Sequence, residues 1–224
     1  MANNPAAGPN AVSAAEAQLA RIAANGCARH PYLLALVEGG GPHGGRDLAD
    51  AVHLLCHLHG RYPGLVELAQ SSVSATAPVS EWLAQAAEAF ERERLYLVRL
   101  TSAVGPMPST PGAAQTEASL SAQRNALETL AMSERRGCAL GAAAALIGDW
   151  WAVRRLLDRA AARAGLDPPP SSLPDDIAVA AALDSMADGP ASERALAFGG
   201  DQLLLQHRGL FDLLEARASA RADN

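Results

Sequence analysis

The chain has 224 residues, of which 49% are hydrophobic and 19% charged, and this composition is too apolar for an intrinsically disordered protein. Its formal net charge of −6 at pH 7 excludes the broad basic surface that neutralises phosphates, so we expect no nucleic-acid partner. No apolar run approaches the roughly 18 residues that a membrane-spanning helix requires, so we expect no membrane partner either. The length fits one well-buried domain.

Composition also indicates the fold class. Alanine is abundant, aromatic residues make up only 4% of the chain, and no stretch alternates β-branched or aromatic residues with polar ones. Leucine and alanine favour helices that pack at short distances. We therefore predict an all-α protein, an antiparallel bundle of five to six main helices formed by residues 13–220 as a single domain. Residues 1–12 are predicted to be disordered.

The cysteines bear on the compartment of the cell. Cys27, Cys56 and Cys138 lie in separate predicted helices and form no Cys-x-x-Cys pair. An odd number of isolated cysteines indicates reduced, buried thiols rather than disulfides. The N-terminal residues lack the basic and apolar regions of a secretion signal. Together these features predict a cytoplasmic location.

The first half of the chain is predicted to form short helices. Ser13 and Glu16 have the spacing of a capping box at a helix start, and Pro31 restarts the helix that follows. Glycine and proline end the later segments. The predicted segments are 13–27, 30–38, 46–59 and a short helix that ends near residue 70.

Longer helices are predicted for the second half. Ser80 and Ser192 are in positions to cap helices, and the proline-rich run 105–112 ends the first of them. The longest helix is expected to be kinked or divided near Gly137 or Gly148. The predicted segments are 81–104, 116–164, 176–187 and 192–220.

One helix carries the residue types of a metal site. His53 and His57 lie one turn apart in the helix 46–59, and Asp50 precedes them at helical spacing. This i, i+3, i+7 pattern places three ligands for a divalent metal on one face. No fourth ligand accompanies them, so a solvated polar face is the favoured interpretation of Asp50, His53 and His57.

Several polar residues are instead predicted to face the interior, because they share helix faces with leucine and alanine. Three imidazoles and three carboxylates of this kind could bind a small ligand or a metal pair, although the Glu-x-x-His spacing of di-iron bundles is absent. For Glu93 and its neighbour Arg94, the simplest interpretation is a set of charges satisfied by neighbouring helices. The predicted inward residues are His30, His59, Glu93, Glu134, Asp149 and His207.

Glu134 and Asp149 fall on one apolar stripe of the long helix. They would be about 22 Å apart along a straight helix, so they cannot share one metal centre. Glu134 is the better functional candidate because it lies beside Arg135 and one turn before Cys138. Asp149 is expected to anchor a buried arginine or a backbone group. The ligand-binding candidates are therefore His30, His59, Glu93, Glu134 and His207.

Two resemblances extend this interpretation. The run HPYLLALVEG over residues 30–39, followed by a helix with His53 and then Tyr62, resembles the opening of heme-oxygenase-like bundles, in particular thiaminase II and pyrroloquinoline-quinone synthase. The segments YLVRLTSAVGPMPSTPG and LAMSERRGCALGAA, with the following ALIGDWWAVR, resemble a small uncharacterised family of alphaproteobacterial proteins. The first resemblance implies a helical fold with a central cavity for a small organic molecule, heme or a metal pair. The second implies no known activity.

Two classes of function remain open. In the first, a polar-lined interior binds a small ligand or metal, and the cofactor is not identified by the sequence. In the second, the protein has no catalytic activity and acts as a structural or interaction protein, a homodimer. The second follows from the small-residue stripe of the long helix and from Trp150 and Trp151, one of which is expected to be packed and the other partly exposed.

Overall fold

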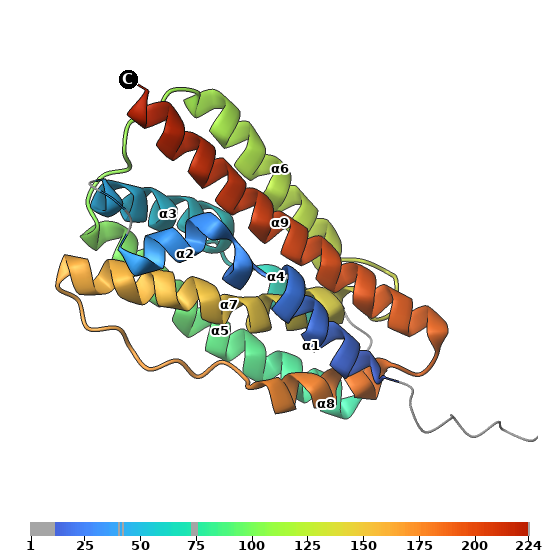
Figure 1. Cartoon of the computed structure of the whole chain (residues 1–224). Helices are drawn as coiled ribbons and strands as arrows, with labels where there is room; N and C mark the ends of the chain where they lie inside the picture. Colours follow the sequence, from blue (N-terminus) through green and yellow to red (C-terminus); the bar gives the residue numbers. More distant parts are fainter. Residues whose placement is uncertain (1–11, 40, 42, 73–75, 224) are drawn as a thin grey trace, which may run out of the picture.

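The computed structural model describes residues 12–39, 41, 43–72 and 76–223, and every regular element among them is helical. The predicted all-α bundle is confirmed, with the helices arranged mainly side by side (Figure 1). Apart from Val12, the segment predicted to be disordered lies outside the described residues. None of the helices in the described part of the chain is long and apolar enough to cross a membrane.

In the first half of the chain, the described residues form five α-helices and one short 3₁₀ helix. The predicted capping box is present, since the Glu16 amide donates to Ser13 Oγ at 3.1 Å and the Ser13 amide donates to Glu16 Oε2 at 3.0 Å. Pro31 opens a helix as predicted, with His30 as its N-cap. The elements are α1 (Ala14–Asn25), η1 (Cys27–Arg29), α2 (Pro31–Glu38), α3 (Gly44–His59), α4 (Leu65–Ser72) and α5 (Ala77–Ala103).

The longest predicted helix is divided at Gly137, one of the two positions predicted for a kink or division. The predicted helix 116–164 is two helices, because the chain leaves the helical path after residue 131 and Gly137 adopts φ 99° before the next helix begins. That positive φ is readily available only to glycine. The helix then continues through Gly148 without a break. The elements are α6 (Ala113–Ala131), α7 (Cys138–Ala164), α8 (Asp176–Met186) and α9 (Pro190–Ala222).

Helix α7 is the centre of the fold. It contacts every other helix of the described chain and lies between α9 and α5 in Figure 1. Residues 138–147 of α7 are all buried, so the first part of this helix is apolar around its whole circumference rather than along one stripe. Any polar side chain in the middle of α7 must therefore find its partners inside the protein.

The pairing of α7 with α9 depends on glycine. A Cβ atom at Gly141 of α7 would overlap the carbonyl oxygen of Leu196, and one at Gly199 of α9 would overlap the carbonyl oxygen of Cys138. The two backbones therefore approach closely at reciprocal glycines. This close approach explains the small residues at the start of α7, and it holds α9 in the register that brings His207 to the middle of α7.

Candidate functional site

A buried acid in the middle of α7, Asp149, organises the polar interior. Its Oδ1 accepts a hydrogen bond from the backbone amide of Cys27 at 2.8 Å, and its Oδ2 accepts one from His207 Nδ1 at 2.7 Å. The Cys27 thiol donates weakly to the Asp149 carbonyl oxygen, with an S–O distance of 3.8 Å. Cys27, Asp149 and His207 are 0%, 2% and 1% exposed. Three segments far apart in the sequence, η1, α7 and α9, thus meet at one carboxylate.

Gly26 makes this approach possible. A Cβ at that position would collide with Asp149 Oδ1 and with the carbonyl oxygen of Ile22. The glycine ends α1 and leaves the next amide, that of Cys27, free to point at the carboxylate. Burial raises the pKa of the Cys27 thiol well above its usual value, and the negative charge of Asp149 raises this pKa further. The thiol is therefore protonated when no cation is near.

A second imidazole extends the cluster on the far side of His207. The Nε2 atoms of His207 and His59 are 3.1 Å apart, and the His59 ring packs edge-on against Trp150 at 5.2 Å and Phe90 at 6.2 Å between ring centroids. Burial lowers the pKa of His59 well below its usual value, with smaller contributions from His207 and Arg94. His59 is therefore neutral, and one of the two facing nitrogens carries a hydrogen while the other offers a lone pair. We call Cys27, Asp149, His207 and His59 the Asp149 cluster.

Glu93 lies next to this cluster, but its carboxylate already forms an ion pair with Arg154. Its Oε2 accepts from the Trp150 indole at 3.1 Å, and its Oε1 accepts from Arg154 Nη1 at 2.7 Å and from Ser171 Oγ at 2.8 Å. Ser171 comes from the long connection between α7 and α8, which passes beside α5 in Figure 1. The predicted interpretation of Glu93, a charge satisfied by its neighbours, agrees with this geometry.

Arg94 has partners separate from those of Glu93. Its Nη2 donates to both carboxylate oxygens of Glu67, at 2.7 and 2.9 Å, and its Nε donates to the carbonyl oxygen of His59 at 3.3 Å. The guanidinium therefore links α5 to α4 and to the C-terminal end of α3. It also fixes the backbone of His59, so the imidazole that faces His207 has a defined position.

The predicted Asp50 site must be corrected. Asp50 does not lie on a solvated face: it is 0% exposed and accepts from Arg217 Nε at 2.9 Å and Nη2 at 2.7 Å, and from Arg221. His53 Nε2 bonds the Gly105 carbonyl oxygen at 2.8 Å, and His57 Nδ1 lies 3.8 Å from Glu117. The three side chains therefore have three different sets of partners. The sequence pattern missed this because the arginines that bury Asp50 come from α9.

Glu134 requires a second correction. It was predicted to face the interior on a continuous helix, but it is exposed in the connection between α6 and α7. The helical phase used for the prediction does not apply across the break at Gly137. Asp149 was predicted to anchor either a buried arginine or a backbone group. It anchors a backbone group, the Cys27 amide, and no arginine among the described residues bonds it.

His30 is buried, as predicted, but it lies outside the Asp149 cluster. Its Nδ1 accepts from the Tyr32 amide at 3.2 Å, which caps α2, and its Nε2 lies 3.0 Å from Asp212 Oδ1. Its ligand atoms also come within 4.8 Å of those of Asp212 and Glu215, but both of these acids are exposed. Of the predicted candidates, the structure thus brings His59 and His207 together and leaves His30 with its own partners.

The residue that the sequence missed is Cys27. In the part of the chain that is described, Cys27 Sγ, an Asp149 carboxylate oxygen and a His207 ring nitrogen lie within 4.8 Å of one another, and all three residues are buried. No local motif predicts this group, because its members are separated by 122 and 58 residues. The only local signal is Gly26 before Cys27, which permits a close approach of another group.

The cluster lies next to an open pocket. Asp149 lines this pocket, which has a volume of about 540 Å³ and lies between α1 and α7, beside the half-exposed Trp151. Arg155, Asp175 and Asp176 contribute charged groups to the same pocket. Asp149, the acid at the centre of the cluster, is thus one of the residues that border this pocket.

These features define an all-α protein with a buried cysteine–carboxylate–imidazole cluster on its central helix. The chain belongs to a family of unknown function, DUF6975, whose model matches residues 22–222. No curated protein matches the sequence. No solved structure matches it either.

Proposed function

We propose that the protein binds a divalent transition-metal ion through Cys27, Asp149 and His207. The observation that carries this proposal is the convergence of a thiol, a carboxylate and an imidazole within 4.8 Å at a buried point of the central helix. Thiolate, imidazole and carboxylate together suit zinc and the ions that resemble it, such as Co²⁺ and Fe²⁺. Three protein ligands leave a fourth position for water or substrate, the arrangement typical of catalytic rather than structural zinc.

The charges of such a site balance. A Cys27 thiolate and the Asp149 carboxylate supply two negative charges, and a neutral His207 supplies none. A divalent cation therefore gives a neutral buried site, which is the arrangement that a low-dielectric interior tolerates best. Binding releases one proton, that of the Cys27 thiol.

The metal would lie between Asp149 and His207, where it would replace the hydrogen bond that joins their side chains. Asp149 Oδ2 and His207 Nδ1 are 2.7 Å apart, with a proton between them. Two nitrogen or oxygen ligands of a tetrahedral metal are about 3.4 Å apart, so the two groups need to separate by less than about 1 Å. The proton on Nδ1 is replaced by the metal, and His207 then carries its hydrogen on Nε2.

His59 acts in this scheme as a positioning residue. A neutral His59 can accept a hydrogen bond from His207 Nε2 as readily as it can donate one. Metal ligation at Nδ1 therefore reverses the direction of the hydrogen bond between the two imidazoles without leaving either nitrogen unsatisfied. Partners of this kind orient metal-bound histidines in many proteins.

The remaining sequence-based interpretations stay predictions. The heme-oxygenase-like relationship, the alphaproteobacterial origin and the cytoplasmic location are supported only by the residues that suggested them. The homodimer alternative is supported by the exposure of Trp151, which is 43% exposed while Trp150 is fully buried. The metal proposal has the more specific support, because it depends on three converging ligand atoms.

Cobalt titration tests the proposal. Metal-free wild-type protein titrated with Co²⁺ is expected to bind one equivalent and to develop a thiolate-to-cobalt charge-transfer band in the near ultraviolet. Cys27→Ala should lose the band, and His207→Gln should lose most of the affinity. His59→Gln should keep the band and bind about 10- to 100-fold more weakly, as expected for a residue that orients a ligand.

Cys138→Ala is the matched control, because Cys138 is also a buried free thiol and is absent from the cluster. It should retain the band and the stoichiometry of the wild type. A wild-type spectrum that stays that of aqueous Co²⁺, or a band that persists in Cys27→Ala, would contradict the proposal.

A further inference from the structure

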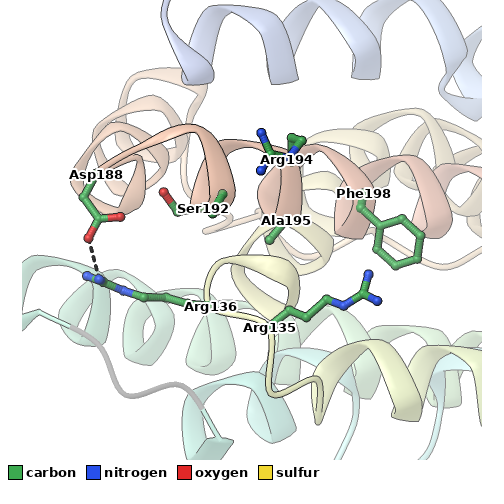
Figure 2. Close-up of a pocket in the computed structure, with 8 residues that line it drawn as sticks. Arg135, Arg136, Asp188, Ser192, Arg194, Ala195 and Phe198 are labelled. Carbon is green, nitrogen blue, oxygen red and sulfur yellow. Dashed lines mark ion pairs between the residues drawn. The ribbon is translucent and has the colours of Figure 1, made fainter.

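A second pocket, separate from the Asp149 cluster, lies where the connection between α6 and α7 meets the start of α9. Its volume is about 690 Å³, within the range of roughly 300–1,000 Å³ that is usual for small-molecule sites. Figure 2 shows Arg135 and Arg136 on one side of it and the side chains of α9 on the other. Its lining is Arg135, Arg136, Asp188, Ala191, Ser192, Arg194, Ala195 and Phe198.

The pocket carries an excess of positive charge. Its lining contains three guanidinium groups and one carboxylate, and this carboxylate, Asp188, is paired with Arg136 at one end of the pocket (Figure 2). Among the described residues, neither Arg135 nor Arg194 forms an ion pair or a side-chain hydrogen bond. Within the described part of the chain, these two permanent cations have no carboxylate partner, although the formal net charge of the chain is −6.

The pocket also has an apolar wall. The Phe198 ring is 44% exposed, and Ala191 and Ala195 lie on the preceding turns of α9. The Arg135 guanidinium lies 5.6 Å from the centroid of the Phe198 ring, a cation–π contact that holds the arginine against the aromatic surface. Figure 2 shows Arg135 extended toward Phe198, away from the paired Arg136 and Asp188.

We propose that this pocket binds a small organic anion, a carboxylate or phosphate attached to an aromatic or apolar body. The planar fork of arginine matches both acid groups, and hydrogen bonds between ions are about twice as strong as neutral ones. Arg135 and Arg194 bind the acid group, and Phe198 with the alanines contacts the apolar body. The site is independent of the metal proposal, because it shares no residue with the Asp149 cluster.

Calorimetry with three probes tests the assignment: benzoate, phenyl phosphate and inorganic phosphate. At least one of the aromatic probes is expected to bind, and the one that binds more tightly identifies the acid group. Inorganic phosphate is expected to bind at least several-fold more weakly than phenyl phosphate because it cannot use the apolar wall. Raising the salt concentration should weaken binding.

Variants assign the binding to this pocket. Arg135→Ala and Arg194→Ala are each expected to lower the affinity for the aromatic probe about tenfold or more, because each removes one charge-assisted contact. Asp188→Asn releases Arg136 from its partner and is expected to strengthen binding several-fold. Arg99→Ala, at an exposed arginine of α5 outside the pocket, is the matched control and should leave the affinity unchanged.

Three results would overturn the proposal. They are no binding of either aromatic probe at millimolar concentration, unchanged affinity in the double variant Arg135→Ala/Arg194→Ala, and a loss in Arg99→Ala as large as in the pocket variants. Equal affinity for inorganic phosphate and phenyl phosphate would overturn the assignment of the apolar wall. All of these side chains are exposed, so thermal unfolding of each variant should match the wild type and confirm that the fold is intact.

Discussion

Two acids of this protein are equally buried and have opposite surroundings. Asp50 on α3 is 0% exposed and Asp149 on α7 is 2% exposed. Asp50 is bonded by the guanidinium groups of Arg217 and Arg221, whereas Asp149 is bonded by a backbone amide and an imidazole. Burial alone therefore does not distinguish an acid that holds the fold together from one that is available for chemistry.

The partners do distinguish them. Arginine stays protonated at all accessible pH values, so the ion pairs of Asp50 cannot exchange a proton for another cation. The partners of Asp149 include a thiol that can release its proton when a metal binds and an imidazole that can carry its hydrogen on either nitrogen. The first cluster joins α3 to α9 as part of the scaffold. The second can change its protonation state without unfolding the protein.

Matched substitutions of the two acids should show the largest difference. Asp50→Asn leaves two buried guanidinium groups without a full countercharge, and we expect it to lower the free energy of unfolding by about 3–5 kcal/mol. Asp149→Asn should cost about 1 kcal/mol, because the amide oxygen can still accept from Cys27 and its NH₂ group can donate to the other tautomer of His207. Denaturant unfolding of metal-free protein measures both values. Equal losses in the two variants would contradict the distinction between the clusters.

Lowering the pH should produce a smaller change in the free energy of unfolding, and this change should come from the Asp149 cluster. The pKa of His59 is lowered well below its usual value by burial, so only the unfolded state takes up this proton as the pH falls below about 6.5. Stability is then lost progressively, by at most about 1.4 kcal/mol at one pH unit below that value. The groups that face the ring are His207, Trp150 and Phe90, with Arg94 near its backbone.

Unfolding of chelator-treated protein at several pH values checks this contribution. His59→Leu should reduce the dependence on pH between 7 and 5.5, although the variant is less stable overall. His57→Gln is the control, because His57 is exposed on the same helix and should keep the wild-type slope. An unchanged slope in His59→Leu would show that another group is responsible.

The smallest effect is expected at the acid that the sequence favoured. Glu134 is exposed in the connection before α7, and Glu134→Gln should change the free energy of unfolding by less than about 0.5 kcal/mol. It should also leave cobalt binding unchanged. Thermal unfolding with and without Co²⁺ compares this variant with the wild type. A loss of metal-dependent stabilisation in Glu134→Gln would show that Glu134 contributes to the metal site.

The helices could be predicted from local patterns. The break that divides the predicted helix 116–164 into α6 and α7 could be predicted only in part. The capping box of Ser13 and the proline at position 31 are local signals, and both helix starts are where they indicate. Gly137 was one of two proposed breaks in the longest helix, but nothing local shows that the break spans several residues. The apolar stripe predicted to contain both Glu134 and Asp149 is therefore interrupted before Cys138, which explains why Asp149 is buried and Glu134 is not.

The site could be predicted less well than the fold. Helical phase indicates that His59, Glu93 and His207 point inward, and all three are buried. It does not indicate which helices are neighbours, so it cannot show that His207 meets His59 while Glu93 meets Arg154. Cys27 begins the three-residue 3₁₀ helix η1, which is too short to show a helical period, and its place beside Asp149 depends on the packing of three distant segments.

An X-ray absorption spectrum of the zinc-loaded protein shows directly whether Cys27 binds the metal. The account predicts one sulfur ligand at about 2.3 Å and nitrogen or oxygen ligands at about 2.0–2.2 Å, with the sulfur lost in Cys27→Ala and retained in Cys138→Ala. Zinc surrounded only by nitrogen and oxygen in the wild type, or a sulfur that remains in Cys27→Ala, would contradict it.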